Sequence, residues 1–416
     1  MKYETVSLDF LSNKKEWSLF ICILLVIFIL NLLGSYIKYH DFQKEELFKT
    51  TGQVLTIYEK ENYDVLKIKN KDMTFFTSVT KDRNIHKMND IDLVILTKGI
   101  DFISYIRGFY TKSFNVYLKD KKNNIKTKLY YKIMSQHENK QISELFNAIF
   151  FAIPLSSEVR DFCAVLGISH LIAISGFHLG IMILVLYWFF SFPYSYFHKR
   201  YFPFRNKKFD VLLICSVILF FYLLFTNIVP SLLRAFVMFI FGLYLLRHNI
   251  KVLSYETLCI ITLVIIAIFP NYAFSLSLWF SLIAVFYIFL FLQYFKKLPK
   301  VGQFLLFNIW IYLVMNPISH YYFGITSILQ LFSPILTMGF SIFYPLEFIL
   351  HLFGYGFILD GLIEYALSLE RNSYLIFTPA IFFYIYLGLS FFSIWFKKIF
   401  VLLNMALVAF TCYLYI

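Results

Sequence analysis

Long apolar runs follow one another through most of the chain, and this feature constrains the fold more than any other. A helix needs about 20 predominantly apolar residues to cross a bilayer. Trp17–Ile37 forms one such run, and from about Val165 onward the chain is nearly all apolar. The later spans are expected near 166–190, 209–228, 231–247, 254–270, 273–294, 303–322, 325–343, 345–359, 374–396 and 399–416. The run at 345–359 is short for a crossing, so its path is left open.

The composition supports a polytopic membrane protein. Of the 416 residues, 59% are hydrophobic and 15% charged, whereas soluble domains have about 45–50% and about 25%. The net charge of +13 fits basic cytoplasmic loops, which we favour, and also a polyanionic substrate. The five cysteines form no CxxC pair, so no metal site, disulfide framework or cofactor is expected.

The chain divides into four parts by composition. Residues 1–37 form an amino-terminal tail and a retained membrane anchor. Residues 38–140 form a β-rich domain, 141–165 an amphipathic connecting segment within the longer helical pattern of 130–155, and 166–416 a multi-helix transmembrane domain. The connecting segment fits either a helix in the membrane interface or a helix facing a protein core.

Short β-type runs punctuated by turn residues fill residues 38–140. They are QVLTIYE near 53–59, YDVLKIK near 63–69, MTFFTSV near 73–79, DLVILT near 92–97 and FNVYLK near 114–119. Residues 38–142 contain 20 Lys and Arg against 13 Asp and Glu, a net charge of +7. Such spacing predicts a small β-barrel or sandwich, of which an OB-like barrel is one form. A purely structural module without a ligand is an equal alternative.

Basic residues in the loops predict the orientation of the helices. They lie in the loops that follow the predicted spans at 166–190, 231–247, 273–294 and 374–396. All of these loops fall on one side if 345–359 crosses. These residues are Lys199, Arg200, Arg205, Lys207, Lys208, Arg247, Lys251, Lys296, Lys297, Lys300, Lys397 and Lys398. The positive-inside rule places that side in the cytoplasm. The amino terminus is then cytoplasmic and residues 38–140 are extracytoplasmic.

The stretch Gly167–Ile181, read as GISHLIAISGFHLGI, places polar groups within an apolar run. It carries Ser169, His170, Ser175 and His178, and Gly176 lies among them. Ionisable groups in a membrane usually face a cavity or a partner helix, and small residues allow close approach or a break. We expect a packed, interrupted helix that lines a hydrated path, with Gly176 as one place for the break. Bonding between helices is the alternative.

A catalytic role for Ser175 and His178 is also considered, because residues three apart share a helix face. A Ser–His site also needs an orienting third group and an oxyanion hole, and no carboxylate lies within the span. We therefore assign no catalytic residue and expect no enzyme.

Three further polar positions lie in apolar runs. Arg234 follows Pro230, and proline starts a helix well. The guanidinium either reaches the membrane interface or faces a pore, where it can contact phosphate bidentately. Ser277 and Asn316, together with Ser275 and Asn308, either line a path or bond helices together.

Several of these blocks resemble the ComEC family of competence proteins. The strongest match is GISHLIAISGFHLGI, and Arg160 fits an arginine in the family's short lead-in. The blocks VPSLLRAFVM at 229–238, FSLSLWFSLIAV at 274–285 and residues 308–334 resemble later family blocks, although Trp279 and Phe280 depart from the usual pattern. The β-rich domain is similar to the family's OB-fold domain.

The resemblance implies an inner-membrane channel that passes single-stranded DNA into the cytoplasm during natural transformation. Its partners would be single-stranded DNA, membrane lipids, a periplasmic DNA receptor and a cytoplasmic ATPase or helicase, since the sequence has no Walker A pattern. A homo-oligomer is compatible with this role. Many family members add a metallo-β-lactamase-like domain, whereas this sequence ends in the 399–416 run, so we expect no nuclease activity by that route.

A competing class is a transporter of small molecules or lipid-linked substrates, or an intramembrane enzyme that uses the Ser/His segment at 169–178. A transporter built from inverted repeats should show matching broken segments in its two halves, and the sequence shows none clearly. An enzyme should place convergent carboxylates or a nucleophile near one membrane face. The channel is therefore preferred.

Overall fold

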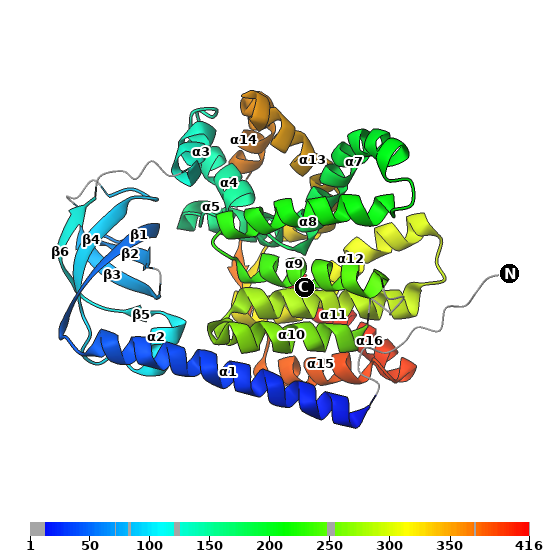
Figure 1. Ribbon diagram of the computed structural model, residues 1–416, viewed down its shortest axis with the longest axis horizontal. Helices are drawn as coiled ribbons and strands as arrows, with labels where there is room; N and C mark the ends of the chain where they lie inside the picture. The colour runs from blue at the N-terminus through cyan, green and yellow to red at the C-terminus, as the bar shows by residue number, and fades with distance from the viewer. Residues whose placement is uncertain are drawn as a thin grey trace.

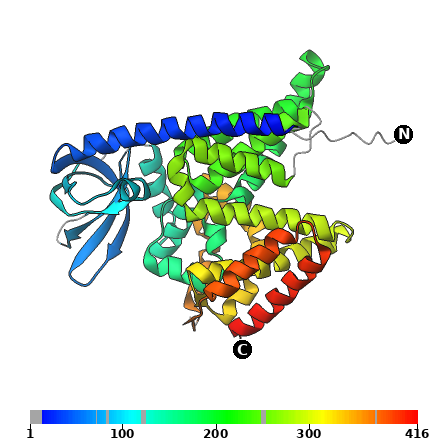
Figure 2. The ribbon, with the colours of Figure 1, turned by 90° about the horizontal axis from the view of Figure 1, so that it is seen from below.

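A six-stranded β-sheet lies beside a larger assembly of helices in the computed structural model of the chain (Figure 1). The structure describes residues 13–70, 72–81, 85–119, 125–247, 254–369 and 372–415. Helix α1 (Lys14–Gln43) runs along the helical part and ends at the sheet, and α15 and α16 lie on the opposite side (Figure 2). The first part of the predicted tail, residues 1–12, and Lys251 lie outside the described residues.

Seven of the described helical segments are long and apolar enough to cross a membrane. They are α1, α7 (Gly176–Tyr201), α8 (Lys207–Phe225), α11 (Leu276–Phe295), α12 (Lys300–Tyr322), the segment Ile328–Phe353 and α16 (Lys397–Tyr415). Three shorter apolar helices accompany them: α9 (Pro230–Arg247), α10 (Tyr255–Ile268) and α15 (Ala380–Phe392). Many of their large apolar side chains are exposed, as expected for surfaces that face lipid. The protein is a multi-pass membrane protein.

The five β-type runs all form strands, as their composition and the turn residues between them predict. The strands are β1 (Leu47–Glu59), β2 (Tyr63–Lys69), β3 (Thr74–Thr80), β4 (Asp90–Leu96), β5 (Phe109–Tyr110) and β6 (Ser113–Leu118), with α2 (Phe102–Arg107) before β5. One face is buried because every second side chain points inward, and these side chains include Val54, Ile68, Phe75, Ile91 and Ile95.

The sheet is not a closed barrel, which corrects part of the predicted fold class. Its strand order is β5-β3-β2-β1-β4-β6, so β5 and β6 are the two edges. These edges are consecutive in the chain, and Thr111 and Lys112 link them through backbone hydrogen bonds to Phe76 and Leu96. The sheet is not closed, because β5 and β6 follow each other along the chain but do not pair with each other.

The connecting segment 141–165 forms two helices that face a protein core, α4 (Lys140–Phe151) and α5 (Ser157–Val165). The helix α3 (Ile125–Met134) precedes them, within the residues predicted to be β-rich. The periodic residues Ile142, Leu145, Phe146, Ile149 and Phe150 are all buried, so α4 packs inside the protein instead of lying in the membrane interface. Lys87 of the β-rich part pairs with Glu144 of α4 at 3.2 Å, which ties the two parts together.

The predicted spans at 325–343 and 345–359 are wrong as two separate helices. After β7 (Ile325–Thr326) and the short helix η2 (Ile328–Phe332), α13 (Ser333–Phe353) continues through Pro345. The helices η3 (Gly356–Leu359) and α14 (Asp360–Ser368) then lead to β8 (Tyr374–Leu375). An internal proline removes one helical hydrogen bond, but the surrounding packing keeps α13 continuous.

Strand β8 pairs antiparallel with β7. This pairing brings the start and the end of the 325–375 segment to the same place. The basic loops before α12 and α16 therefore share one end of the helical part whether or not 345–359 crosses. In both views the connections α7–α8, α11–α12 and α15–α16 lie at the end away from the sheet (Figures 1 and 2), and we call this the basic end.

Candidate functional site

The segment Gly167–Ile181 is an interrupted helix, as predicted, but the break lies before Gly176. After α5, the chain makes the one-turn helix α6 (Ser169–Ile172), leaves helical geometry at Ala173–Ser175 and enters α7 at Gly176. Gly167 adopts φ +69°, and a Cβ there would lie 3.1 Å from Cβ of Ser333. Only glycine takes this conformation readily, and the long helix begins at Gly176, later than the predicted start of the span near 166.

Ser175 and His178 form the cap at the start of α7. The Ser175 hydroxyl accepts a hydrogen bond from the backbone N–H of Phe177 at 3.3 Å and lies 3.2 Å from Nδ1 of His178. That Nδ1 also accepts from the backbone N–H of Ser175 at 3.3 Å. This reciprocal capping box satisfies N–H groups that a helix start leaves free. The two residues meet as predicted, but through the cap and not across the face of a continuous helix.

His178 is fully buried, and its Nε2 has no hydrogen-bond partner in the described structure. The imidazole is enclosed by Phe340 and Tyr344 of α13, with ring centroids 5.4 and 4.9 Å away. A triad-type histidine would have its second nitrogen oriented by a carboxylate, and none contacts Nε2 here. His178 instead joins the start of α7 to α13.

Arg234 lies directly against the start of α7. Its Nη2 is 3.1 Å from the position that a Cβ on Gly176 would take, so the guanidinium uses the space left by that glycine. Pro230 begins α9, and the Ser231 hydroxyl donates to the carbonyl of Ile174 at 2.6 Å. These contacts hold the first turn of α9 against the break that precedes α7.

The charge of Arg234 is buried without an acidic partner. The residue is only 4% exposed. Its Nε donates to the Ser281 hydroxyl at 2.8 Å and its Nη1 to Sδ of Met238 at 3.7 Å. No ion pair joins it to a carboxylate of the described residues. Arginine keeps its charge in proteins, and the start of α7 adds a partial positive charge. The site therefore favours an anion.

The other predicted residues lie apart from this cluster. Ser169 and His170 are exposed on α6, where Nε2 of His170 contacts the Thr337 hydroxyl at 3.1 Å. Ser277 is exposed on the first turn of α11. Asn316 is buried on α12, and its carbonyl accepts from His320. Of the nine predicted residues, the structure brings together Ser175, Gly176, His178, Pro230 and Arg234.

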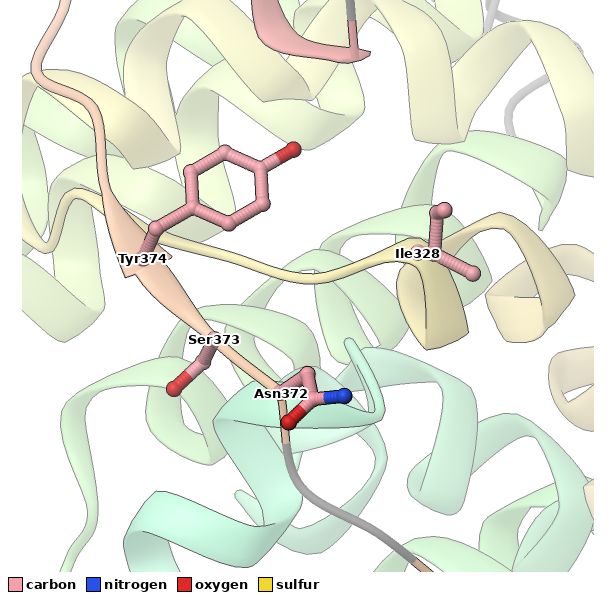
Figure 3. Close-up of a pocket in the computed structure, with 4 residues that line it drawn as sticks. All are labelled: Ile328, Asn372, Ser373 and Tyr374. Atoms are coloured by element: carbon pink, nitrogen blue, oxygen red, sulfur yellow. The ribbon is translucent and has the colours of Figure 1, made fainter.

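Two surface pockets are separate from the arginine site. A pocket of about 320 Å³ lies between η2 and β8 and is lined by Ile328, Asn372, Ser373 and Tyr374 (Figure 3). A pocket of about 490 Å³ is lined mainly by apolar and aromatic side chains of α11, α12 and α15. Neither pocket includes any of the five clustered residues, so neither bears on the anion site.

Sequence reasoning missed three lysines at the junction between the sheet and the helices. Lys67 and Lys69 are two apart on β2 and therefore share one face of the strand. Nζ of Lys69 donates to the carbonyl of Asn227 at 3.5 Å, and Nζ of Lys126 lies 5.8 Å from the Phe225 ring. We call Lys67, Lys69 and Lys126 the junction lysines. The i, i+2 spacing of the first two was a signal for this cluster; Lys126 and Ser281 gave none.

Burial lowers the pKa of all three junction lysines, and repulsion from a neighbouring lysine adds to this effect at Lys69 and Lys126. Burial lowers the pKa of Lys67 and Lys69, and the neighbouring Lys67 adds to the effect on Lys69. Burial, with a smaller contribution from Lys69, lowers the pKa of Lys126 to about 8. No carboxylate of the described residues forms an ion pair with any of the three.

The fold and the site define a multi-pass membrane protein with a buried arginine among its helices. A family model for competence proteins matches residues 154–416. The chain therefore belongs to the competence protein family, which confirms the resemblance seen in the sequence blocks. No curated protein and no solved structure matches the chain. Family membership indicates a role in DNA uptake for transformation.

Proposed function

We propose that the protein is a channel of the cytoplasmic membrane that passes single-stranded DNA into the cell during natural transformation. The observation that carries the proposal is Arg234, a buried cation without a carboxylate partner beside the start of α7. A buried charge is costly unless it is paired. A phosphodiester that passes this point would supply the missing negative charge and accept two guanidinium hydrogen bonds.

The junction lysines extend this cationic surface towards the β-sheet. Lys69 contacts Asn227 in the connection that leads to Pro230 and Arg234. Burial lowers the pKa of all three lysines, with a smaller effect of Lys67 on Lys69 and of Lys69 on Lys126, and a bound polyanion would favour their charged forms. Lys67 also lies 5.5 Å from the Phe76 ring, and the combination of aromatic rings with cations is typical of surfaces that bind single strands.

The proposed orientation places the β-sheet outside the cell and the basic end in the cytoplasm. Positive loops that remain on the cytoplasmic side support it. DNA would then meet the junction lysines before Arg234. In this proposal the protein is not an enzyme. A periplasmic receptor would deliver the DNA, and a cytoplasmic ATPase or helicase would draw it inward.

The test is the import of labelled DNA into a strain that lacks the protein. DNA that remains accessible to added nuclease is outside the membrane, and protected DNA has crossed it. We expect the deletion strain to bind DNA at its surface and to protect almost none, and we expect the full-length protein to restore protection. Equal amounts of protected DNA with and without the protein would contradict the proposal.

A further inference from the structure

Four titratable side chains form a buried line that the DNA path does not use. Nδ1 of His137, between α3 and α4, lies 2.9 Å from Oδ1 of Asp360, the first residue of α14. Nε2 of His137 lies 2.9 Å from Nε2 of His351 on α13. Nδ1 of His351 lies 2.7 Å from the backbone oxygen of Glu347 and 3.1 Å from its carboxylate. Residues more than 200 positions apart in the chain thus meet in one place.

Asp360 is the least buried of the four side chains. The Asp360 side chain is 16% exposed, and those of His137, His351 and Glu347 are 0%, 3% and 1% exposed. The Phe146 ring lies against both imidazoles, with centroids 5.0 and 4.4 Å away. Both carboxylate oxygens of Glu347 lack hydrogen-bond partners in the described structure. Asp360 is therefore the end that meets solvent, and Glu347 is the enclosed end.

The distances require one more proton than an ionised Asp360 and two neutral histidines carry. Nδ1 of His351 faces a carbonyl oxygen, which only accepts, so this nitrogen carries a hydrogen. An ionised Asp360 also only accepts, so Nδ1 of His137 carries a hydrogen too. Two Nε2 atoms at 2.9 Å are at hydrogen-bond distance, and the bond forms only if one of them is protonated. The three groups then hold three protons, one more than an ionised aspartate with two neutral histidines.

The proton count does not depend on where the protons reside. A protonated Asp360 donating to Nδ1 of His137 would let Nε2 of His137 donate to His351, again with three protons in total. If one proton is removed, two nitrogen lone pairs face each other, or a carboxylate faces a lone pair. The observed geometry is therefore that of the proton-loaded state under either arrangement.

We propose that Asp360, His137 and His351 form a proton-binding site that fastens the end of α13 and the start of α14 to the α3–α4 connection. Uptake of one proton from solvent through Asp360 completes the hydrogen-bonded chain and closes this contact. Release of the proton to solvent opens it. We call the three residues the proton chain.

The surroundings of the proton chain support this assignment. The titratable groups that face His137 are Asp360 of α14 and His351 and Glu347 of α13, whereas α4 contributes aromatic rings. Burial lowers the pKa of His137, with Asp360 opposing the effect, so we expect loading on the acidic side of the usual histidine range. A bridging metal is not consistent with the geometry, because two nitrogens each about 2.0–2.1 Å from a tetrahedral zinc lie more than 3 Å apart. The part of the chain that the structure describes also holds no suitable cluster.

The contact is continuous with the helix that encloses His178. Gln136 accepts from the backbone N–H of Gly356 at 3.1 Å and donates to the carbonyl of His351 at 3.3 Å, so it spans the same joint. Tyr344, one turn before Glu347 on α13, packs on His178. Closing of the proton chain therefore acts on the helix that holds the start of α7.

The test is hydrogen exchange of the full-length protein in lipid nanodiscs between pH 5.5 and 8.5. The reporter is the protection of peptides that cover Gln136 and Gly356, corrected for the intrinsic pH dependence of exchange. If closing takes up one proton, the ratio of closed to open protein falls by up to tenfold per pH unit above the loading range. Protection should therefore decrease as pH rises.

Asp360→Asn is the informative variant, because its amide N–H can donate to His137 as a protonated aspartate would. The chain is then complete without the additional proton, and we expect high protection at every pH. His137→Gln should also lose the pH dependence. His170→Gln is the matched control, since His170 lies outside the proton chain and its Nε2 contacts the Thr337 hydroxyl, and it should keep the wild-type profile. A pH-independent wild type, or an Asp360→Asn profile that parallels the wild type, would overturn the proposal. Neither result depends on whether the protein transports DNA.

Discussion

Arg205 and Arg234 both belong to the helical part, but Arg205 pairs with a carboxylate whereas Arg234 has none among the described residues. Arg205 lies at the basic end and donates from Nε and Nη2 to the two oxygens of Asp210, each at 2.8 Å. Tyr194 donates to the same carboxylate. Arg234 is more deeply buried, yet its nitrogens contact only a hydroxyl and a thioether.

The difference is between a charge neutralised within the protein and a charge for which we propose an external ligand. A bidentate pair with a carboxylate neutralises Arg205 within the protein, and its role is to connect α7 and α8. Arg234 keeps its charge and lies where α7 and α9 begin. No carboxylate of the described residues pairs with Arg234, and we propose that DNA phosphate is its partner.

The largest effect is expected for Arg234→Met, which keeps the length of the side chain and removes its charge. Two charge-assisted hydrogen bonds at about 1.5 kcal/mol each correspond to roughly a 100-fold loss of transformation. Membrane abundance should stay normal, because replacing a buried unpaired charge by an apolar group is often neutral or stabilising. Arg205→Met is the matched control and should change transformation less than about twofold at equal abundance, because Asp210 already neutralises the charge of Arg205. If transformation and abundance fall in proportion, Arg234 has only a packing role.

A smaller effect is expected for Gly176→Ala. The added Cβ would lie 3.1 Å from Nη2 of Arg234 and 3.3 Å from Cβ of Ala235, so it displaces the guanidinium without removing its charge. We expect roughly a tenfold loss of transformation at normal abundance, since one of two such hydrogen bonds is about 1.5 kcal/mol. Gly180→Ala is the control, because nothing lies within 4 Å of a Cβ at that position. Equal effects at the two glycines would show that helix packing and not the arginine is affected.

The smallest effect is expected for Lys126→Gln, measured as binding of labelled single-stranded DNA to the full-length protein. Loss of one phosphate contact lowers the log–log salt slope by about 0.7 and weakens binding roughly fourfold near 0.15 M salt. With a pKa of about 8, Lys126 is charged at pH 7 and mostly neutral at pH 9. The difference between wild type and variant should therefore shrink as pH rises from 7 to 9. Lys38→Gln is the control, because Lys38 already pairs with Asp72. A difference that does not change with pH would argue against a role for the Lys126 charge.

The spans and strands were predictable because each depends on a local pattern. A run of about 20 apolar residues or a strict alternation carries its own structural signal. The continuity of α13 through Pro345 and the start of α7 at Gly176 were not predictable in this way, because packing against distant helices decides both.

The site was predictable only in part for the same reason. Polar residues in an apolar run marked Ser175, His178 and Arg234 individually. Nothing local indicated that Arg234 lies on Gly176 or donates to Ser281, and the proton chain joins His137 to residues more than 200 positions later. Such pairs are defined by the tertiary fold and have no spacing rule in the sequence.

The two-residue pairing of β7 with β8 has a consequence for how this protein can diversify. The segment between Ile325 and Leu375, which contains α13, begins and ends at the same place in the helical part. The two ends of this segment are therefore held together at one place by the β7–β8 pairing. Insertions or substitutions in the loops of this segment would leave α15 and α16 in the same orientation across the membrane. Loops of this segment can therefore change while the remaining transmembrane topology stays the same, whereas α13 is constrained by its packing on His178.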